Sequence, residues 1–165
     1  QRMIHDWFIQ VEPDYNDFIK ALLVGDKKAM NAYMNRVALG TFSYFDMGNR
    51  PSDEAPKRFY HGFVLGLIVD LQGRYVITSN RESGFGRYDV MIEPKNPEEN
   101  DAYILEFKVH DSEDEKDLRE TVQSALQQID ERQYKAQLGM RGISEKKIHS
   151  YGFAFQGKKV LIDGE

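Results

Sequence analysis

Three segments rich in β-branched and aromatic residues constrain the fold of this chain more than any other feature. They span residues 75–78, 88–92 and 102–109, and two short connections separate them, a glycine-containing turn at 83–86 and a polar loop at 94–101. Connections of this length join neighbouring antiparallel strands, whereas parallel strands need a longer crossover. The segments therefore predict an antiparallel meander of three strands.

Helical patterns precede this meander. Apolar residues recur at three- and four-residue intervals over residues 14–37, and a Gly-Asp pair at 25–26 divides them, which predicts a helical hairpin. Residues 59–71 are almost wholly apolar, with Gly62 and Gly66 four positions apart. This pattern predicts a helix that is buried on most sides and closely approached by a sheet.

A helix and two strands are predicted after the meander. The helix runs from about residue 113 to 138, and the strands span residues 150–156 and 159–162 around a tight glycine turn. The apolar stripe of the helix consists of Leu118, Val122, Ala125 and Ile129. An order of helix, three strands, helix and two strands predicts an α/β fold (α+β mixed sheet) with helices packed against the sheet.

The length of 165 residues allows one domain, or one domain with a small helical appendage. Turn-forming residues concentrate between positions 46 and 56, which makes this segment the best candidate for a linker. We therefore expect a helical connector or appendage at residues 1–50 and the main domain at residues 51–165.

Composition excludes several kinds of site. The chain has no cysteine, which rules out disulfides, zinc-thiolate sites and thiol nucleophiles, and its four histidines lack metal-ligand spacing. No apolar run approaches the roughly 20 residues that a membrane span requires. We therefore expect a cytoplasmic protein that does not contact a membrane.

The net charge of −5 counts against a general nucleic-acid binder, because Lys and Arg supply most non-specific affinity for phosphates. The charges are nevertheless unevenly distributed, since acidic residues crowd positions 93–120 and the C-terminal third is basic. This asymmetry is compatible with a nuclease that has an acidic metal pocket and a basic rim. It is equally compatible with an ordinary solvated surface.

Three polar residues in the predicted strands could carry chemistry. Glu106 and Lys108 lie on one face of their strand, because side chains alternate, and Asp89 in the preceding strand can reach the same patch. Two neighbouring carboxylates repel each other unless a cation lies between them, and their oxygens suit Mg²⁺ or Mn²⁺. Such an ion, with a lysine beside it, has the parts that phosphodiester hydrolysis requires. An ordinary half-exposed antiparallel strand would show the same spacing.

A resemblance over a long stretch favours the catalytic interpretation. The segments FYHGFVLGLIVDLQGRYVITSNRESGFGRYDVMI, AYILEFKV, SALQQIDERQY and YGFAFQGKKVLI resemble the nuclease domain of a bacterial family in the PD-(D/E)xK superfamily. Members of that family carry an AAA-type ATPase domain before the nuclease, and MIHDWF with DYNDFIKALL resembles the helical connector between them. The resemblance implies a restriction-endonuclease-like core and an AAA-type ATPase domain in the same full-length chain.

The resemblance also implies roles for individual residues. Asp89 of GRYD and Glu106 of EFK would bind the metal together with the backbone carbonyl of Phe107, and Lys108 would be the catalytic lysine. Gln128 on the following helix would border the site. The alternative is that Gln128 is a solvent-exposed residue on the flank of the helix.

Further residues are candidates for contacts with substrate. Tyr134 occupies the position of the tyrosine that follows in the family pattern, and Arg81 and Arg87 flank the glycine turn with Glu82. Arginine suits phosphate recognition because its donors form a planar fork. The sequence is equally compatible with Arg81, Glu82 and Arg87 being ordinary solvent-exposed residues.

The sequence departs from the family pattern in two places. Tyr88 replaces the proline of the motif, which affects only the backbone shape. Lys57 stands where the resemblance leads us to expect a glutamate, and a lysine cannot bind a metal. Glu54 and His61, each about one helical turn away, are the candidate substitutes.

Two hypotheses follow from these residues. The first is a Mg²⁺-dependent nuclease, with DNA as the default substrate by analogy with the family. The alternative is a catalytically weakened nuclease-like module that serves binding or assembly beside an ATPase, and Lys57 is the feature that favours it.

Overall fold

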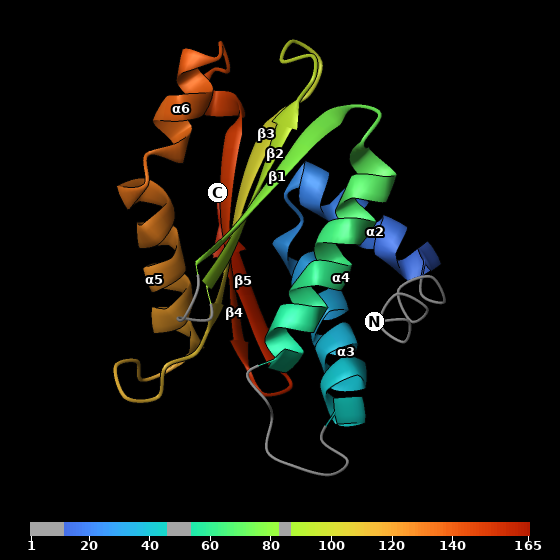
Figure 1. Cartoon of the computed structure of the whole chain (residues 1–165), viewed down its shortest axis with the longest axis vertical. Coiled ribbons are helices and arrows are strands. Elements are labelled where there is room, and N and C mark those ends of the chain that lie inside the picture. Colours follow the sequence, from blue (N-terminus) through green and yellow to red (C-terminus); the bar gives the residue numbers. More distant parts are fainter. Residues whose placement is uncertain (1–11, 46–53, 83–86) are drawn as a thin grey trace.

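A five-stranded sheet separates two layers of helices in the computed structural model, which describes residues 12–45, 54–82 and 87–165 (Figure 1). The strands lie in the order β1-β2-β3-β4-β5. They are β1 (Tyr75–Glu82), β2 (Arg87–Pro94), β3 (Ala102–Val109), β4 (Ile148–Gln156) and β5 (Lys159–Gly164). The helices are α2 (Glu12–Val24), α3 (Lys27–Phe45), α4 (Glu54–Leu71), α5 (Leu118–Glu131) and α6 (Tyr134–Met140), with a 3₁₀ turn at Glu145–Lys147.

The sheet is mixed, and its first three strands form the predicted antiparallel meander. β1 pairs antiparallel with β2, and β2 pairs antiparallel with β3. β4 pairs parallel with β3, because the chain crosses over through α5 and α6 before it returns, and β5 closes the sheet as an antiparallel neighbour of β4. The predicted α/β fold with a mixed sheet is confirmed.

Helices α2 and α3 form the predicted hairpin. Gly25 takes a positive φ of 75° at the turn, which glycine adopts without a steric penalty. The Asp26 carboxylate then accepts a hydrogen bond from the amide of Ala29 (3.1 Å) and caps the start of α3.

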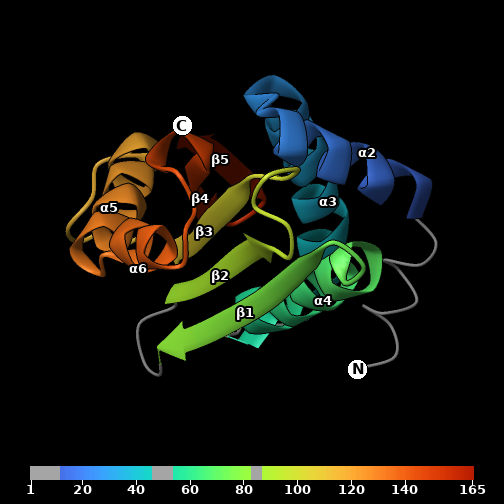
Figure 2. The same ribbon diagram turned by 90° about the horizontal axis from the view of Figure 1, so that it is seen from above.

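The layer of α2, α3 and α4 covers one face of the sheet with an aromatic core (Figure 2). The ring of Phe63 on α4 lies 5.3 Å from the ring of Phe107 on β3, which lies 4.6 Å from the ring of Phe153 on β4. Helices α5 and α6 cover the opposite face, where Ile104 packs with Ile129 in a second core cluster. Because side chains alternate along β3, Glu106 and Lys108 face the layer of α5, whereas Phe107 faces the aromatic core.

Helix α4 differs from its prediction in length and in burial. It begins at Glu54, so its first turn lies inside the predicted linker, and proline is tolerated there at position 56. The rest of that linker, at 46–53, lies outside the described residues. The prediction of burial on most sides is wrong, because Leu65 is 51% and Val69 is 66% exposed.

Gly66 of α4 is approached closely, although not by the sheet as expected. A Cβ atom at this position would lie 2.9 Å from the ring of Tyr15 on α2. The glycine therefore lets two helices of one layer approach each other. In the described part of the chain, no helix is both long and apolar enough to cross a membrane.

The long helix predicted at 113–138 is two helices. Asp117 caps α5 by accepting a hydrogen bond from the amide of Glu120 (3.0 Å), and the Glu120 carboxylate accepts one from the amide of Lys116 (2.8 Å). These two hydrogen bonds cap the helix, which starts at Leu118, later than predicted. Gln133 then takes a positive φ of 56° between α5 and α6, which ends the first helix. The stripe predicted on α5 does pack inward, since Val122, Ala125 and Ile129 are buried.

Two asparagines of α3 satisfy the outer edge of β5. Asn31 donates to the carbonyl of Ile162 (2.9 Å) and accepts from its amide (2.8 Å). Asn35 does the same with the carbonyl (2.8 Å) and the amide (2.9 Å) of Val160. An edge strand exposes unpaired backbone groups, so these side chains take the place of a sixth strand.

Candidate metal centre

Asp89 and Glu106 lie directly opposite each other on neighbouring strands. The register of β2 and β3 pairs these two residues, so their side chains emerge on one face of the sheet. Residues paired in this way have Cβ atoms about 4.5–5.5 Å apart. Both side chains lie in the interior, since Asp89 is 4% and Glu106 is 1% exposed. The tertiary structure thus brings two carboxylates from adjacent strands into one buried patch.

The carboxylate of Asp89 is held by two donors from the other side of the patch. Its Oδ2 atom accepts a hydrogen bond from Arg132 Nη1 (2.6 Å) and another from Tyr134 Oη (2.6 Å). Arg132 Nη1 also donates to Tyr134 Oη (3.1 Å), so the three side chains form a closed triangle. Burial raises the pKa of the Tyr134 phenol, and its hydrogen bond to Asp89 raises this pKa further. Tyr134 therefore acts as a neutral donor.

The break between α5 and α6 explains how both donors reach one oxygen. Residues two positions apart on a continuous helix point in nearly opposite directions, about 200° around the axis. Gln133 lies between Arg132 and Tyr134 in the left-handed region, and this conformation turns the chain. The side chains on either side of it then converge on Asp89, which a single long helix would not allow.

Lys108 is buried beside this patch and has partners of its own. Only 7% exposed, it forms an ion pair with Glu115, and its Nζ atom donates a hydrogen bond to Ser124 Oγ (3.1 Å). Glu115 precedes α5 in the loop after β3, and Ser124 lies on α5 itself. The lysine therefore stays at a fixed position between the strand and the helix.

Glu115 is the centre of a small buried network. Its Oε1 atom accepts hydrogen bonds from the amide of Asp111 (2.8 Å) and from Thr121 Oγ1 (3.0 Å). Burial raises the pKa of the Glu115 carboxyl, but the hydrogen bonds from Lys108, Asp111 and Thr121 outweigh this effect and hold it below the ordinary value. Glu115 is thus a carboxylate that holds Lys108 in place.

Glu115 and Arg132 were not among the residues that the sequence patterns indicated. Glu115 is one of several acidic residues in the loop before α5, and their local pattern does not distinguish the one that points inward. Arg132 lies inside the helix predicted at 113–138, and the local pattern does not show the break at Gln133 that turns this residue toward the sheet. Neither residue gave a signal that separates a buried partner from a solvated side chain.

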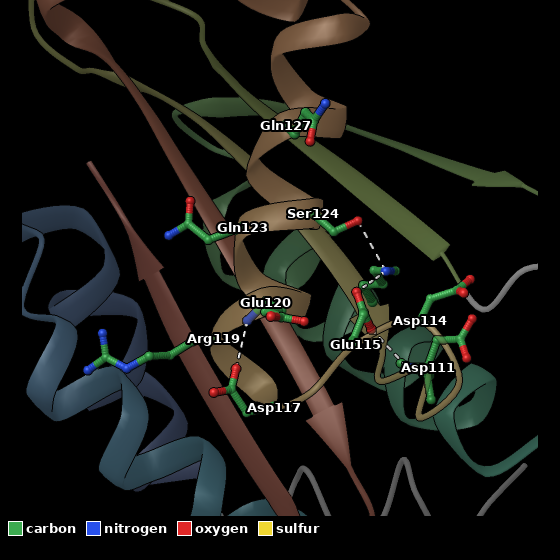
Figure 3. Close-up of a pocket in the computed structure, with 11 residues that line it drawn as sticks. Asp111, Asp114, Glu115, Asp117, Arg119, Glu120, Gln123, Ser124 and Gln127 are labelled. Carbon is green, nitrogen blue, oxygen red and sulfur yellow. Dashed lines mark hydrogen bonds and ion pairs between the residues drawn. The ribbon is translucent and has the colours of Figure 1, made fainter.

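An acidic cavity of about 900 Å³ is lined by Lys108 and not by Asp89 or Glu106. Figure 3 shows the side chains of Glu115 and Ser124 pointing toward each other beside α5, and the carboxylates of Asp111 and Asp114 on the loop before this helix. The charged residues that line the cavity are Lys108, Asp111, Asp114, Glu115, Asp117, Arg119 and Glu120. Because acidic side chains outnumber basic ones, this cavity attracts cations and repels a phosphate backbone.

The remaining predicted residues are described only in part. Gln128 is half-buried on α5, and its backbone carbonyl accepts a hydrogen bond from the amide of Arg132 (3.1 Å). The side chains of five sequence candidates lie outside the described residues, namely Glu54, His61, Arg81, Glu82 and Arg87, as do those of Lys57 and Tyr88, the two departures from the family pattern. The roles expected for them, for Gln128 and for the carbonyl of Phe107 stay predictions.

The residues of the patch suit a divalent cation in part. Two buried carboxylates at one register position offer hard oxygen ligands, and their mutual repulsion favours a cation between them. Among the side chains that the structure describes, no group of three or more His, Asp or Glu residues could hold a metal ion. The patch therefore offers the carboxylates of Asp89 and Glu106, and an ion bound there would need backbone oxygens and water to complete its coordination.

Comparisons with known proteins identify the family. No curated protein and no solved structure matches the chain significantly. The family model described as PD-(D/E)XK nuclease superfamily matches residues 55–165, which include the five strands and every residue of the patch. With two thirds of its length matched and an α/β fold consistent with that family, this chain belongs to the PD-(D/E)XK nuclease superfamily.

Proposed function

We propose that this chain is a Mg²⁺- or Mn²⁺-dependent nuclease domain that hydrolyses phosphodiester bonds in DNA. The observation that carries the proposal is the pairing of Asp89 with Glu106 across β2 and β3, with Lys108 on the same face. Nucleases of the superfamily usually hydrolyse phosphodiester bonds and typically use divalent metal ions. The two buried carboxylates are the ligands that such an ion requires.

In this proposal Asp89 and Glu106 hold the ion, with the carbonyl of Phe107 as a backbone ligand. A bound ion supplies Lewis-acid polarisation of the phosphodiester and lowers the pKa of a coordinated water. The carboxylates bring the negative charge that offsets the ion, and their position deep in the α5 face excludes most bulk water from it.

Lys108 acts on the water or on the phosphoryl oxygen. Its ammonium group has three N–H donors. Within the described part of the chain, Glu115 and Ser124 accept two of them, which leaves one donor for a reacting group. A donor at a fixed position stabilises charge that develops on the phosphate oxygens without reorganising during the reaction.

Substrate contacts and the wider architecture extend this proposal. Gln128 and Tyr134 would border the bound phosphate, and Arg81 and Arg87 would contact the nucleic-acid backbone. The acidic cavity repels phosphate, so we expect the nucleic-acid substrate to approach Lys108 from the side of β1 and β2. An AAA-type ATPase domain in the same full-length chain is the proposed partner, with residues 1–50 as its connector and residues 51–165 as the nuclease domain.

A second candidate function is a nuclease-like module that binds or assembles without efficient cleavage. Lys57 favours it, because it stands where the resemblance predicts an acidic ligand. The contact of Arg132 with Asp89 also favours it, because a guanidinium group lies against one of the proposed ligands. In this alternative the patch would retain its fold and lack turnover.

Cleavage of plasmid and single-stranded DNA in the presence of Mg²⁺ or Mn²⁺ distinguishes these functions. We expect the parent protein to cut, Lys108→Ala to lose activity by about 10²-fold or more, and Lys146→Ala to cut like the parent. Lys146 is an exposed lysine of the 3₁₀ turn and serves as the matched control. Equal nicking by the parent and Lys108→Ala would refute the role of Lys108, and no cleavage by the folded parent would favour the second function.

A further inference from the structure

We propose that Arg132 is a built-in counterion of the candidate metal centre, which occupies Asp89 when no divalent ion is bound and must leave it when one binds. The inference rests on the proposed function, because it assumes that Asp89 binds the ion. It assigns to Arg132 a positioning role that is set by competition with the metal.

The two carboxylates set the charge balance of the patch. Asp89 and Glu106 are opposite each other in the register and almost completely buried. Two carboxylates this close repel each other in an interior of low dielectric constant, so the fold needs a positive charge nearby when the ion is absent. Arg132 supplies that charge directly, with Nη1 2.6 Å from Asp89 Oδ2.

Asp89 Oδ2 accepts hydrogen bonds from two donors. A carboxylate oxygen has about two lone-pair sites. The guanidinium of Arg132 and the phenol of Tyr134 both donate to Oδ2, each at 2.6 Å, and so occupy them. A divalent ion that binds through this oxygen must therefore displace one donor. Arg132 is the donor that the ion repels, because arginine stays protonated at any relevant pH.

The backbone at Gln133 directs Arg132 toward the patch. Gln133 holds a left-handed conformation that residues with a Cβ atom adopt only at an energetic cost. Such strain persists where the surrounding structure requires it and often marks functional sites. The side chain of Arg132 is 19% exposed, compared with 5% for that of Asp89, so part of it reaches solvent although its Nη2 atom is buried.

A purely structural role for Arg132 makes a different prediction. If the ion pair only fastened the elbow between α5 and α6 to the sheet, its removal would lower stability without strengthening metal binding. If Arg132 instead oriented Asp89 for the ion, its removal would weaken binding. Competition alone predicts that a neutral residue at this position binds the ion more tightly.

The test measures Mn²⁺ affinity by isothermal titration calorimetry for the whole chain and its variants. Breaking one charge-assisted contact on binding corresponds to roughly tenfold to a hundredfold in affinity, so Arg132→Met should bind Mn²⁺ tighter by that factor. Arg141→Met is the matched control, because it removes one positive charge from an exposed ion pair with Glu93. It should bind within about twofold of the parent. Tyr134→Phe removes the neutral donor and should change affinity less than Arg132→Met.

The outcomes separate this inference from the proposed function. Tighter binding by Arg132→Met supports it, including the case in which the parent shows no measurable binding. In another outcome the parent binds Mn²⁺, Asp89→Ala abolishes this binding, and Arg132→Met binds equally or more weakly than the parent. This outcome overturns the inference but leaves the proposed metal site intact. Absence of binding in every variant overturns both.

A measurement on the parent keeps the inference testable if Arg132→Met does not fold. The side-chain Nε–Hε resonance of Arg132, assigned by comparison with Arg132→Lys, should shift when Mg²⁺ is added. The resonance of Arg141 should not follow it. A resonance of Arg132 that stays unchanged at saturating Mg²⁺ would contradict displacement.

Discussion

Removal of Glu115 should destabilise the protein strongly, because it leaves the ammonium group of Lys108 buried without its counter-charge. Removing one partner of a buried ion pair costs about 3–5 kcal/mol. The acidic cavity beside Lys108 admits water, so we expect Glu115→Ala to lie at the lower end, about 3 kcal/mol. Glu115→Gln keeps the shape and one acceptor, and should cost about 1–3 kcal/mol.

Urea denaturation followed by circular dichroism measures these free energies of unfolding. A double-mutant cycle with Lys108→Met isolates the coupling between the two side chains, which we expect at about 1–3 kcal/mol. Glu113→Gln is the matched control, because it neutralises an exposed glutamate of the same loop and should change stability by less than about 0.5 kcal/mol.

The stabilisation by Glu115 should decrease as the pH falls. The folded-state pKa of Glu115 lies below its ordinary value, so the ionised carboxylate stabilises the fold above the unfolded-state pKa. This stabilisation is lost as the pH falls through the folded-state pKa. The difference in the free energy of unfolding between the parent and Glu115→Gln should therefore be constant near neutral pH and shrink below about pH 4.3. A difference equal to that of Glu113→Gln, or no coupling with Lys108→Met, would refute the argument.

Two further predictions concern the packing that supports the site. Asn31→Ala should lower the free energy of unfolding by about 1–3 kcal/mol in the same urea assay, because it leaves the amide and carbonyl of Ile162 at the β5 edge without their side-chain partner. An unchanged urea midpoint would show that water replaces the asparagine. Gly152→Ala should cost about 1–3 kcal/mol, because its Cβ would lie 3.0 Å from the carbonyl oxygen of Val122 and 3.2 Å from Ala125 Cβ where α5 crosses β4. Gly139→Ala, at a position with no neighbour within 4 Å, is the control, and equal effects for the two glycines would contradict the packing argument.

The patch illustrates how one loop and one helix break create a buried polar site. Glu115 reaches Lys108 from the loop before α5, and Arg132 reaches Asp89 from the end of α5. The two cations and two acids thus form separate pairs around Glu106. Each pair satisfies a group that would otherwise be costly to bury.

Local pattern determined the elements of the fold. Alternation in residues 102–109 predicted the strand that the structure shows as Ala102–Val109, and it placed Glu106 and Lys108 on one face. The Gly-Asp pair at 25–26 predicted the turn between α2 and α3, because glycine adopts the positive φ that this turn needs. These features depend on near neighbours in the chain, so the sequence alone was sufficient.

The tertiary structure decided which residues meet. A shift of one residue in the register of β2 and β3 would move Asp89 to the other face of the sheet, and no local pattern fixes that register. The exposure of α4, the break at Gln133 and the partners of Asp89 and Lys108 likewise depend on contacts between distant segments. Periodicity specifies the face of an element on which a side chain lies. The charge that it meets there is set by the path of loops and helices far along the chain.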